Sequence, residues 1–146
     1  MPSYAELSTR LLNFANRELG AGVSEDEIAA AERTLDVRIE GGYRQFLKQF
    51  GWGSVEHLEL YGFGGPPHLN LVRATLSERR EMEPALPAHL VPVMSDGGGN
   101  LLCLDTQVAK EPPIVFWDHT GGVDQEPEVE AESFSSWLWE QLDELA

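Results

Sequence analysis

Four side chains that could ligate a divalent metal stand where strands are expected to end. Asp96, Asp105 and Asp118 offer carboxylates, and His119 adds an imidazole beside the third of them. Carboxylates with imidazole suit divalent cations, so a metal-dependent hydrolase is one interpretation of the chain. However, no two of the 4 histidines have the i, i+4 spacing of a helical zinc pair, and Asp at a strand end is ordinary turn chemistry. We therefore expect no metal site.

A glycine run is the second candidate, because the exposed backbone N–H groups of Gly97, Gly98 and Gly99 could cradle a phosphate. Phosphate-binding loops connect a strand to a helix, whereas this run is expected to connect two strands and has no base nearby. Cys103 lies among leucines, where burial makes a thiol a poor nucleophile, and no serine stands in a nucleophile elbow. The sequence predicts no catalytic residue, no cofactor and no small-molecule substrate, and thus a protein that is not an enzyme.

The charge of the chain is strongly negative and unevenly distributed. The formal net charge is -15; residues 111–146 contain 10 acids and no Lys or Arg, whereas residues 1–110 contain 15 acids and 10 bases. Such a field repels phosphate backbones and anionic membranes, and it attracts a basic protein. We expect a basic protein partner and neither a nucleic acid nor a membrane. The alternative is that the acidity only keeps the protein soluble.

Cysteine content and the N-terminal sequence indicate the compartment. The single cysteine forms no internal disulfide, and the first residues, MPSYAELSTRLLNFA, lack the basic start and the apolar run of a secretory signal. No apolar stretch approaches the roughly 20 residues that span a bilayer. These features predict a cytoplasmic protein.

The first third of the chain is expected to be helical. Ser3 and Ser24 are each followed three residues later by Glu, the spacing of a capping box, and they predict helices over residues 4–19 and 25–35. Residues 43–50 carry apolar side chains at i, i+3, i+4 and i+7 before two glycines end the pattern. We therefore expect three helices in succession, the third with an aromatic face in the core.

The rest of the chain is expected to be mostly extended. Leu58 and Leu60 alternate with polar residues as in a half-buried strand, and residues 71–83 have the composition of a short helix. A last amphipathic helix should begin after Ser133 and contain Trp137. Three compact apolar runs between these helices predict buried strands, the first two joined by a hairpin loop: Leu90–Met94, Leu101–Leu104 and Ile114–Trp117.

This order of elements indicates a single α+β domain over residues 1–146, an antiparallel sheet with helices packed on one face. About 70% of the surface of an unfolded chain of this length is buried on folding, so one core suffices. The segment 121–132 is the only long polar stretch, and we expect it to be a mobile acidic loop.

Several sequence motifs resemble those of the SUKH superfamily, also called the Smi/Knr-like domain. They are EIAAAERTLDVRIEGGYRQFLKQFGWG, LYGFG, LVPVMSDGGGNLLCLD, VFWDHTGG and SFSSWLWEQL, in the family's order and over residues 24–142. Two departures are Glu40 and Gly41, where the family commonly has a proline, and Asn100, where it usually has an aspartate. The resemblance implies the SUKH fold.

The resemblance also implies a function in binding. Bacterial members are typically immunity proteins of polymorphic toxin systems, which serve bacterial competition, and their toxins are often nucleases. We therefore expect an antitoxin that occludes the active or substrate-binding surface of a cognate toxin. The alternative is a regulatory adaptor domain without a toxin partner, as in fungal relatives.

The expected partner-binding residues are acids for steering and tryptophans for anchoring. Partial burial against a neighbouring loop is the competing expectation for both tryptophans, and a solvated loop is the competing expectation for the C-terminal acids. The complete set is Trp52, Glu56, Glu59, Asp124, Glu126, Glu128, Glu130 and Trp139.

Overall fold

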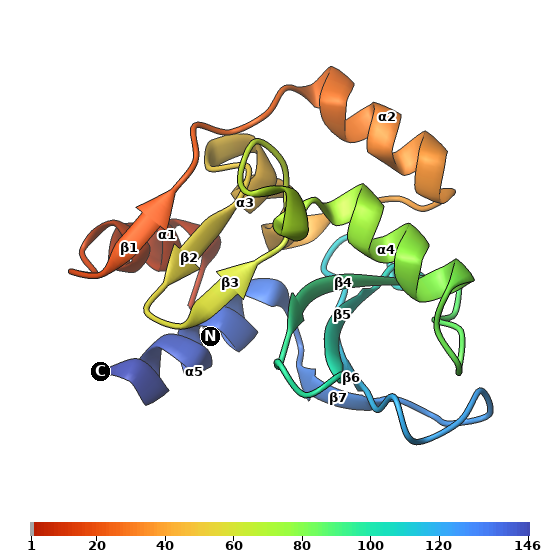
Figure 1. Cartoon of the computed structure of the whole chain (residues 1–146). Helices are drawn as coiled ribbons and strands as arrows, with labels where there is room; N and C mark the ends of the chain where they lie inside the picture. The colour runs from red at the N-terminus through yellow and green to blue at the C-terminus, as the bar shows by residue number, and fades with distance from the viewer. Residues whose placement is uncertain (1) are drawn as a thin grey trace.

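Seven strands form one sheet whose order in space follows their order along the chain, with every neighbouring pair antiparallel (Figure 1). The structure is a computed structural model, and it describes residues 2–146. The predicted α+β class with an antiparallel sheet is confirmed. The strands are β1 (Arg17–Leu19), β2 (Gly53–Val55), β3 (Leu58–Leu60), β4 (Leu90–Ser95), β5 (Leu101–Asp105), β6 (Ile114–Trp117) and β7 (Glu128–Ala131).

Five α-helices and one short 3-10 helix accompany the sheet in the described part of the chain. Helices α1, α3 and α5 contact one another, and α2 lies beside α4 (Figure 1). Serine side chains cap three helices as predicted, since Ser3, Ser24 and Ser133 each accept a hydrogen bond from the first turn. The helices are α1 (Tyr4–Leu12), α2 (Glu25–Leu35), α3 (Gly41–Gln49), η1 (Pro67–Leu69), α4 (Leu71–Arg80) and α5 (Phe134–Leu145).

The main core lies between the sheet and the layer of α1, α3 and α5. Tyr43, Phe46 and Phe134 are fully buried there, and the ring centroids of Tyr43 and Phe134 are 5.1 Å apart. Trp137 belongs to the same cluster. The aromatic faces of the third and last predicted helices are therefore core, as expected.

A smaller cluster fills the opposite face of β4, β5 and β6. Leu101 and Cys103 belong to it, whereas Leu102 and Leu104 belong to the main core, as the alternation of side chains along a strand requires. Trp117 is also part of this cluster. Burial raises the pKa of the Cys103 thiol, so this sulfur is a core atom and not an activated nucleophile.

The predicted helix over residues 4–19 is wrong beyond residue 12. Asn13 caps α1, and Arg17–Leu19 form the edge strand β1, in which Arg17 is opposite Val55 of β2. Asparagines at positions 13 and 16 are poor helix formers, and the pairing with β2 satisfies the backbone instead. Similarly, the single strand expected around Leu58 is a hairpin of β2 and β3, because the chain turns at Glu56, whose φ is 53°.

The acidic segment 121–132 is more ordered than expected. The side chain of Gln125 accepts a hydrogen bond from the Asp118 N–H (3.1 Å) and donates to the carbonyls of Asp118 (2.7 Å) and Gly122 (3.0 Å), which ties the turn together. The chain then forms β7, which pairs with β6 through Val115 and Val129. The prediction of a mobile loop is therefore wrong for residues 128–131, where Val and Ala alternate with Glu.

A bulge in β4 separates the two halves of the sheet. The register of β4 against β5 shifts between Pro92 and Met94, and proline also removes one ladder hydrogen bond. Strand β3 is paired with β4 at a single position, Leu60 with Met94. Beyond that pair the two strands diverge, and a cavity of about 480 Å³ lies between β3, the β4–β5 hairpin and α5.

Candidate protein-interaction site

Seven of the eight predicted partner-binding residues form two separate groups, on either side of the three strands β4, β5 and β6, and the eighth, Trp139, lies on α5. Trp52, Glu56 and Glu59 belong to the β2–β3 hairpin, whereas the segment 124–130 leads into and forms most of β7. Adjacent strands are about 4.8 Å apart, so about 19 Å of sheet separates β3 from β7. The structure therefore offers two candidate contact surfaces.

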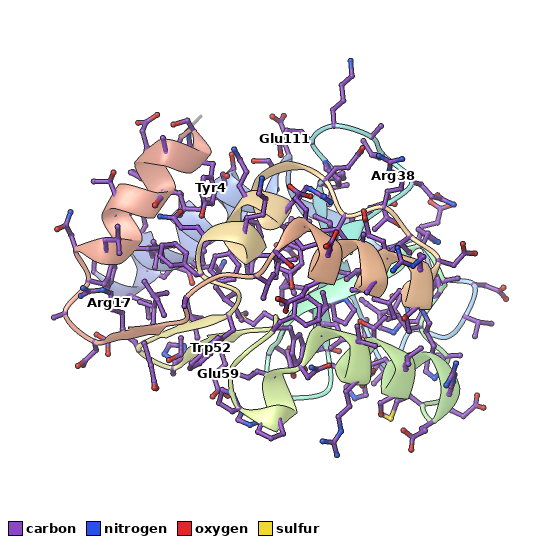
Figure 2. All side chains as sticks on the ribbon, turned by 90° about the horizontal axis from the view of Figure 1, so that it is seen from above. Tyr4, Arg17, Arg38, Trp52, Glu59 and Glu111 are labelled. Carbon is purple, nitrogen blue, oxygen red and sulfur yellow. The ribbon has the colours of Figure 1, made fainter. Side chains whose placement is uncertain are left out.

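The first surface is the side of the β2–β3 hairpin that faces away from the main core. Ser54 is opposite Glu59, and the buried Leu58 and Leu60 point to the other side. Trp52 and Tyr61 lie just beyond the ends of β2 and β3, and the alternation of side chains would place them on the side of Glu59, although Tyr61 also packs against the main core. Figure 2 shows Trp52 and Glu59 close to each other on the same side of the molecule.

Trp52 is half-buried, and glycines make its position possible. A β-carbon on Gly20 would lie 2.5 Å from Cδ1 of the indole, and one on Gly65 would lie 2.4 Å from Cδ2, so two backbones approach the ring more closely than any other residue allows. Trp52 therefore shows the partial burial that was the alternative to an exposed interface anchor. Trp52 presents only part of its ring to a partner.

Glu56 and Glu59 are both exposed, but their side chains have different neighbours. The Glu56 carboxylate accepts a hydrogen bond from Asn16 Nδ2 (3.1 Å), and the Glu56 N–H donates to the Asn16 carbonyl (2.9 Å). Glu59 Oε2 lies 3.4 Å from His68 Nε2 of η1. Glu56 thus holds the hairpin against the α1–β1 connection, and Glu59 is the freer carboxylate.

The second surface is the acidic edge of the sheet, residues 124–130. Asp124, Glu126, Glu128 and Glu130 are all exposed, and Val129 between the last two is 64% exposed. Strand β7 is the last strand of the sheet, so one of its edges has no partner strand within residues 2–146. Glutamates on an edge strand oppose aggregation between copies, and they also suit a basic partner.

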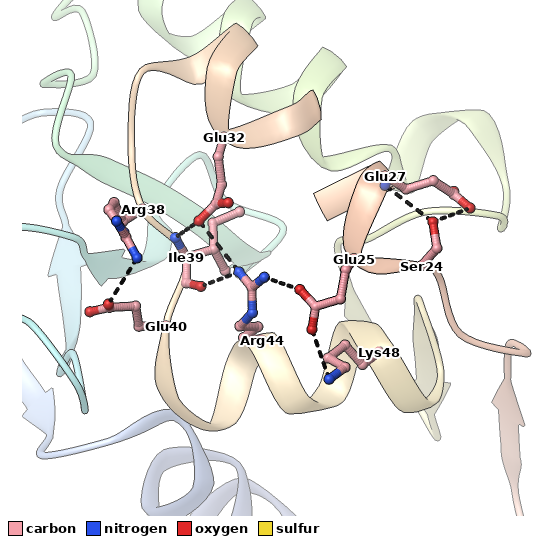
Figure 3. Close-up of polar contacts among 9 residues, drawn as sticks. All are labelled: Ser24, Glu25, Glu27, Glu32, Arg38, Ile39, Glu40, Arg44 and Lys48. Carbon is pink, nitrogen blue, oxygen red and sulfur yellow. Dashed lines mark hydrogen bonds and ion pairs between the residues drawn. The ribbon is translucent and has the colours of Figure 1, made fainter. Parts of the chain in front are cut away.

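Some acids of residues 1–110 have basic neighbours, as the contact between α2 and α3 illustrates (Figure 3). Arg44 pairs with Glu25 and with Glu32 (3.4 Å), and Lys48 pairs with Glu25 (2.8 Å). In contrast, among the 10 acids of residues 111–146, only Asp143 forms an ion pair within the described residues 2–146. The negative charge of the C-terminal quarter therefore remains available to a partner.

Trp139 is half-buried rather than free. The guanidinium carbon of Arg10 lies 4.5 Å from the centroid of its ring, and Arg10 also pairs with Asp143 at 2.8 Å. A cation over an indole face is a favourable contact, which here joins α1 to α5. Trp139 thus serves the packing of two helices, and its role in binding stays a prediction.

The candidate metal ligands do not converge on a site. Among residues 2–146 no group of three or more His, Cys, Asp or Glu side chains is arranged to hold a metal ion. Asp96 accepts hydrogen bonds from Gly98 N–H (2.8 Å) and from the side chain of Asn100 (3.0 Å), while His119 Nδ1 lies 2.7 Å from Asn100 Oδ1. These side chains hold the β4–β5 hairpin, which is the turn chemistry expected of them.

Two residues that were not among the predicted ones, Tyr61 and His68, line the cavity between β3 and β4 and also a neighbouring cavity of about 580 Å³ beside α4. Tyr61 was predictable, because it is two residues from Glu59 and therefore on the same side of the strand. The position of His68 depends on η1, which carries no clear sequence signal.

Glu78 of α4 lines the second cavity, and burial raises the pKa of its carboxyl group above the usual range. The folded state therefore holds this proton at a pH where the unfolded state has lost it, and stability falls as the pH rises through that window. We expect Glu78→Gln to raise Tm at pH 7, and we expect this difference to become small by about pH 3.5, where Glu78 is mostly protonated in both states. Thermal unfolding of both proteins from pH 3.5 to 8 checks this; a Tm difference independent of pH would contradict it.

Within residues 2–146, no helix has the length and the apolar character needed to cross a membrane. A family model described as SMI1-KNR4 cell-wall (SUKH_5) matches residues 7–143. Among solved structures, the chain is similar to a protein from Pseudomonas syringae pv. tomato, with a TM-score of 0.70 and 20% sequence identity over 92% of this chain and 95% of that one. At this identity the likeness concerns the fold. No match was found among curated proteins.

Proposed function

The chain belongs to the SMI1-KNR4 family of the SUKH superfamily, and from this premise we propose that it is an immunity protein, which acts in the cytoplasm by binding and neutralising a cognate toxin. This family is not a known enzyme family. The proposal is therefore one of occlusion: the protein covers the active or substrate-binding surface of the toxin and carries out no reaction itself.

One observation carries the proposal, namely the unpaired acidic surface. Of the 10 acids in residues 111–146, only Asp143 has a basic partner within the described residues, and this stretch contains no Lys or Arg of its own. Keeping like charges together costs folding stability through repulsion, and a basic partner relieves that cost. A toxin that binds phosphates, such as a nuclease, has a basic surface of this kind.

The acidic surface supports fast and selective association. Complementary charge raises association rates from about 10⁵–10⁶ M⁻¹s⁻¹ to as much as 10⁸–10⁹ M⁻¹s⁻¹ at low salt. An antitoxin needs this speed, because it must reach the toxin before the toxin reaches its substrate. The half-buried Trp52 and the β2–β3 hairpin would then supply desolvated contacts that slow dissociation.

The direct test is co-expression with the product of the adjacent upstream gene. We expect that product to stop growth when expressed alone, to be harmless together with this protein, and to co-purify with it as a stoichiometric complex. The control is the destabilised variant Gly62→Ala, which should rescue growth less well, because a loss of a few kcal/mol lowers the abundance of a folded protein in the cell.

If the neighbouring product is not toxic and forms no complex with this protein, the immunity proposal is contradicted. The adaptor alternative would then be the better account. Rescue without any complex would also contradict the immunity proposal, since occlusion requires contact.

A further inference from the structure

The cavity between β3 and β4, which we call the β3–β4 cleft, combines acidic, aromatic and apolar walls. Glu59 and Asp96 bring two carboxylates to it, Tyr61 brings an aromatic ring, and Leu69 and Met94 are apolar. None of its lining residues is a lysine or an arginine. With histidines neutral, the cleft carries a formal charge of about −2 at pH 7.

The two carboxylates of the cleft differ in their freedom to bind. The Asp96 carboxylate already accepts hydrogen bonds from Gly98 N–H (2.8 Å), Asn100 N–H (3.1 Å) and Asn100 Nδ2 (3.0 Å), so it is fixed in place by the hairpin. Glu59 has only the contact with His68 at 3.4 Å, and 53% of its side chain is exposed. A ligand cation would therefore take Glu59 as its main partner, with Asp96 as a fixed second charge.

The residues that line the cleft complement both parts of an arginine side chain, the apolar stem and the guanidinium group. Apolar walls suit the three methylenes of the stem, and an aromatic ring accepts a guanidinium against its face. The planar guanidinium has five N–H donors, enough to engage carboxylates on two sides, which a lysine ammonium does less well. Gln141 of α5 adds a carboxamide that can accept one further hydrogen bond.

We propose that the β3–β4 cleft receives an arginine side chain of the partner protein, held between Glu59 and Asp96 with its stem against Leu69 and Met94. This inference rests on the proposed binding function and specifies one anchor point of it. Arginine is among the residues that most often dominate interfaces, and it does so from pockets that exclude water. The neighbouring cavity shares Tyr61 and His68 with the cleft, so the partner residues that flank this arginine would have space along α4.

The cleft can be tested without the partner. We would titrate the protein with N-acetyl-L-arginine amide and follow its backbone amides by ¹H–¹⁵N NMR. We expect saturable shifts at Glu59, Tyr61 and Asp96 with a dissociation constant on the order of millimolar, a usual value for one small ligand. The citrulline analogue has the same shape without the charge and should bind at least about fivefold more weakly.

Two single-charge variants locate the effect. Glu59→Gln should weaken arginine binding at least about fivefold, whereas Glu126→Gln, which removes the same charge from the acidic edge, should not change it. Both side chains are exposed, so both variants should give the dispersed spectrum of the folded protein. Equal binding of citrulline, or an unchanged affinity in Glu59→Gln, would overturn the proposal.

Failure of the cleft and failure of the immunity proposal give different results. Arginine binding without a toxin complex would leave the cleft standing and remove the immunity proposal. The cleft proposal alone would be overturned if a toxin complex forms, if Glu59→Gln leaves its dissociation rate unchanged, and if the protein does not bind arginine.

Discussion

Gly62→Ala is expected to destabilise the protein by about 3 kcal/mol or more, a large part of the 5–15 kcal/mol that holds a typical domain together. A β-carbon at Gly62 would lie 1.7 Å from the carbonyl oxygen of Gly51, a distance that only a backbone shift can relieve. That carbonyl accepts the Phe63 N–H at 2.7 Å, and Gly62 itself bonds with Leu69 and Leu71 at 2.9 Å each. The shift would therefore break hydrogen bonds around η1. Urea unfolding measures the loss.

Two glycines provide matched controls for this substitution. At Gly98 a β-carbon would meet only Asp96 Oδ1 at 3.5 Å, an ordinary contact, so Gly98→Ala should stay within about 0.5 kcal/mol. At Gly64 the space is open but φ is +86°, so Gly64→Ala should cost about 1 kcal/mol through backbone strain alone. A loss at Gly62 no larger than that at Gly64 would show that the close approach to Gly51 is relieved easily.

The helices were predictable where their signals are local. Ser24 and the acidic turn that follows it define the start of α2, and Ser133 defines the start of α5, because a cap depends on residues three positions apart. Strand β1 carries no such signal: three residues become a strand only because β2, more than thirty positions later, offers a backbone to pair with. Pairing between distant segments overrides local propensity.

The candidate site was predictable only in part. The acidity of residues 111–146 and the position of Glu59 follow from the sequence. The β3–β4 cleft does not, because it lies where β3 and β4 pair at a single position beside a bulge in β4. Pro92 within an otherwise apolar strand was the one visible signal, since proline inside a sheet often marks a bulge. That the predicted residues lie on two separate surfaces could not be predicted, because it depends on the order of the strands in the sheet, which no local sequence pattern contains.

The quadruple variant Asp124→Asn, Glu126→Gln, Glu128→Gln, Glu130→Gln is expected to associate with the co-purified partner about tenfold more slowly at low salt, with a nearly unchanged dissociation rate. These exposed acids have no basic neighbour within the described residues, so they act on the partner before contact. The difference should shrink as salt rises, because the Debye length falls from about 10 Å at 0.1 M to 3 Å at 1 M. Stopped-flow mixing over a range of salt measures both rates.

A second quadruple variant separates the acidic edge from net charge. Glu18, Asp26, Glu81 and Glu83 are exposed and form no ion pair within residues 2–146, so neutralising them removes the same total charge from other surfaces. We expect this control to slow association by no more than about threefold, since steering depends on where charge faces the partner. If both quadruple variants slow association equally, overall charge and not the acidic edge attracts the partner. If the variant of residues 124–130 associates at an unchanged rate, the acidic edge is not part of the binding surface. The acids of β7 would then serve only to keep an open sheet edge from pairing with another copy.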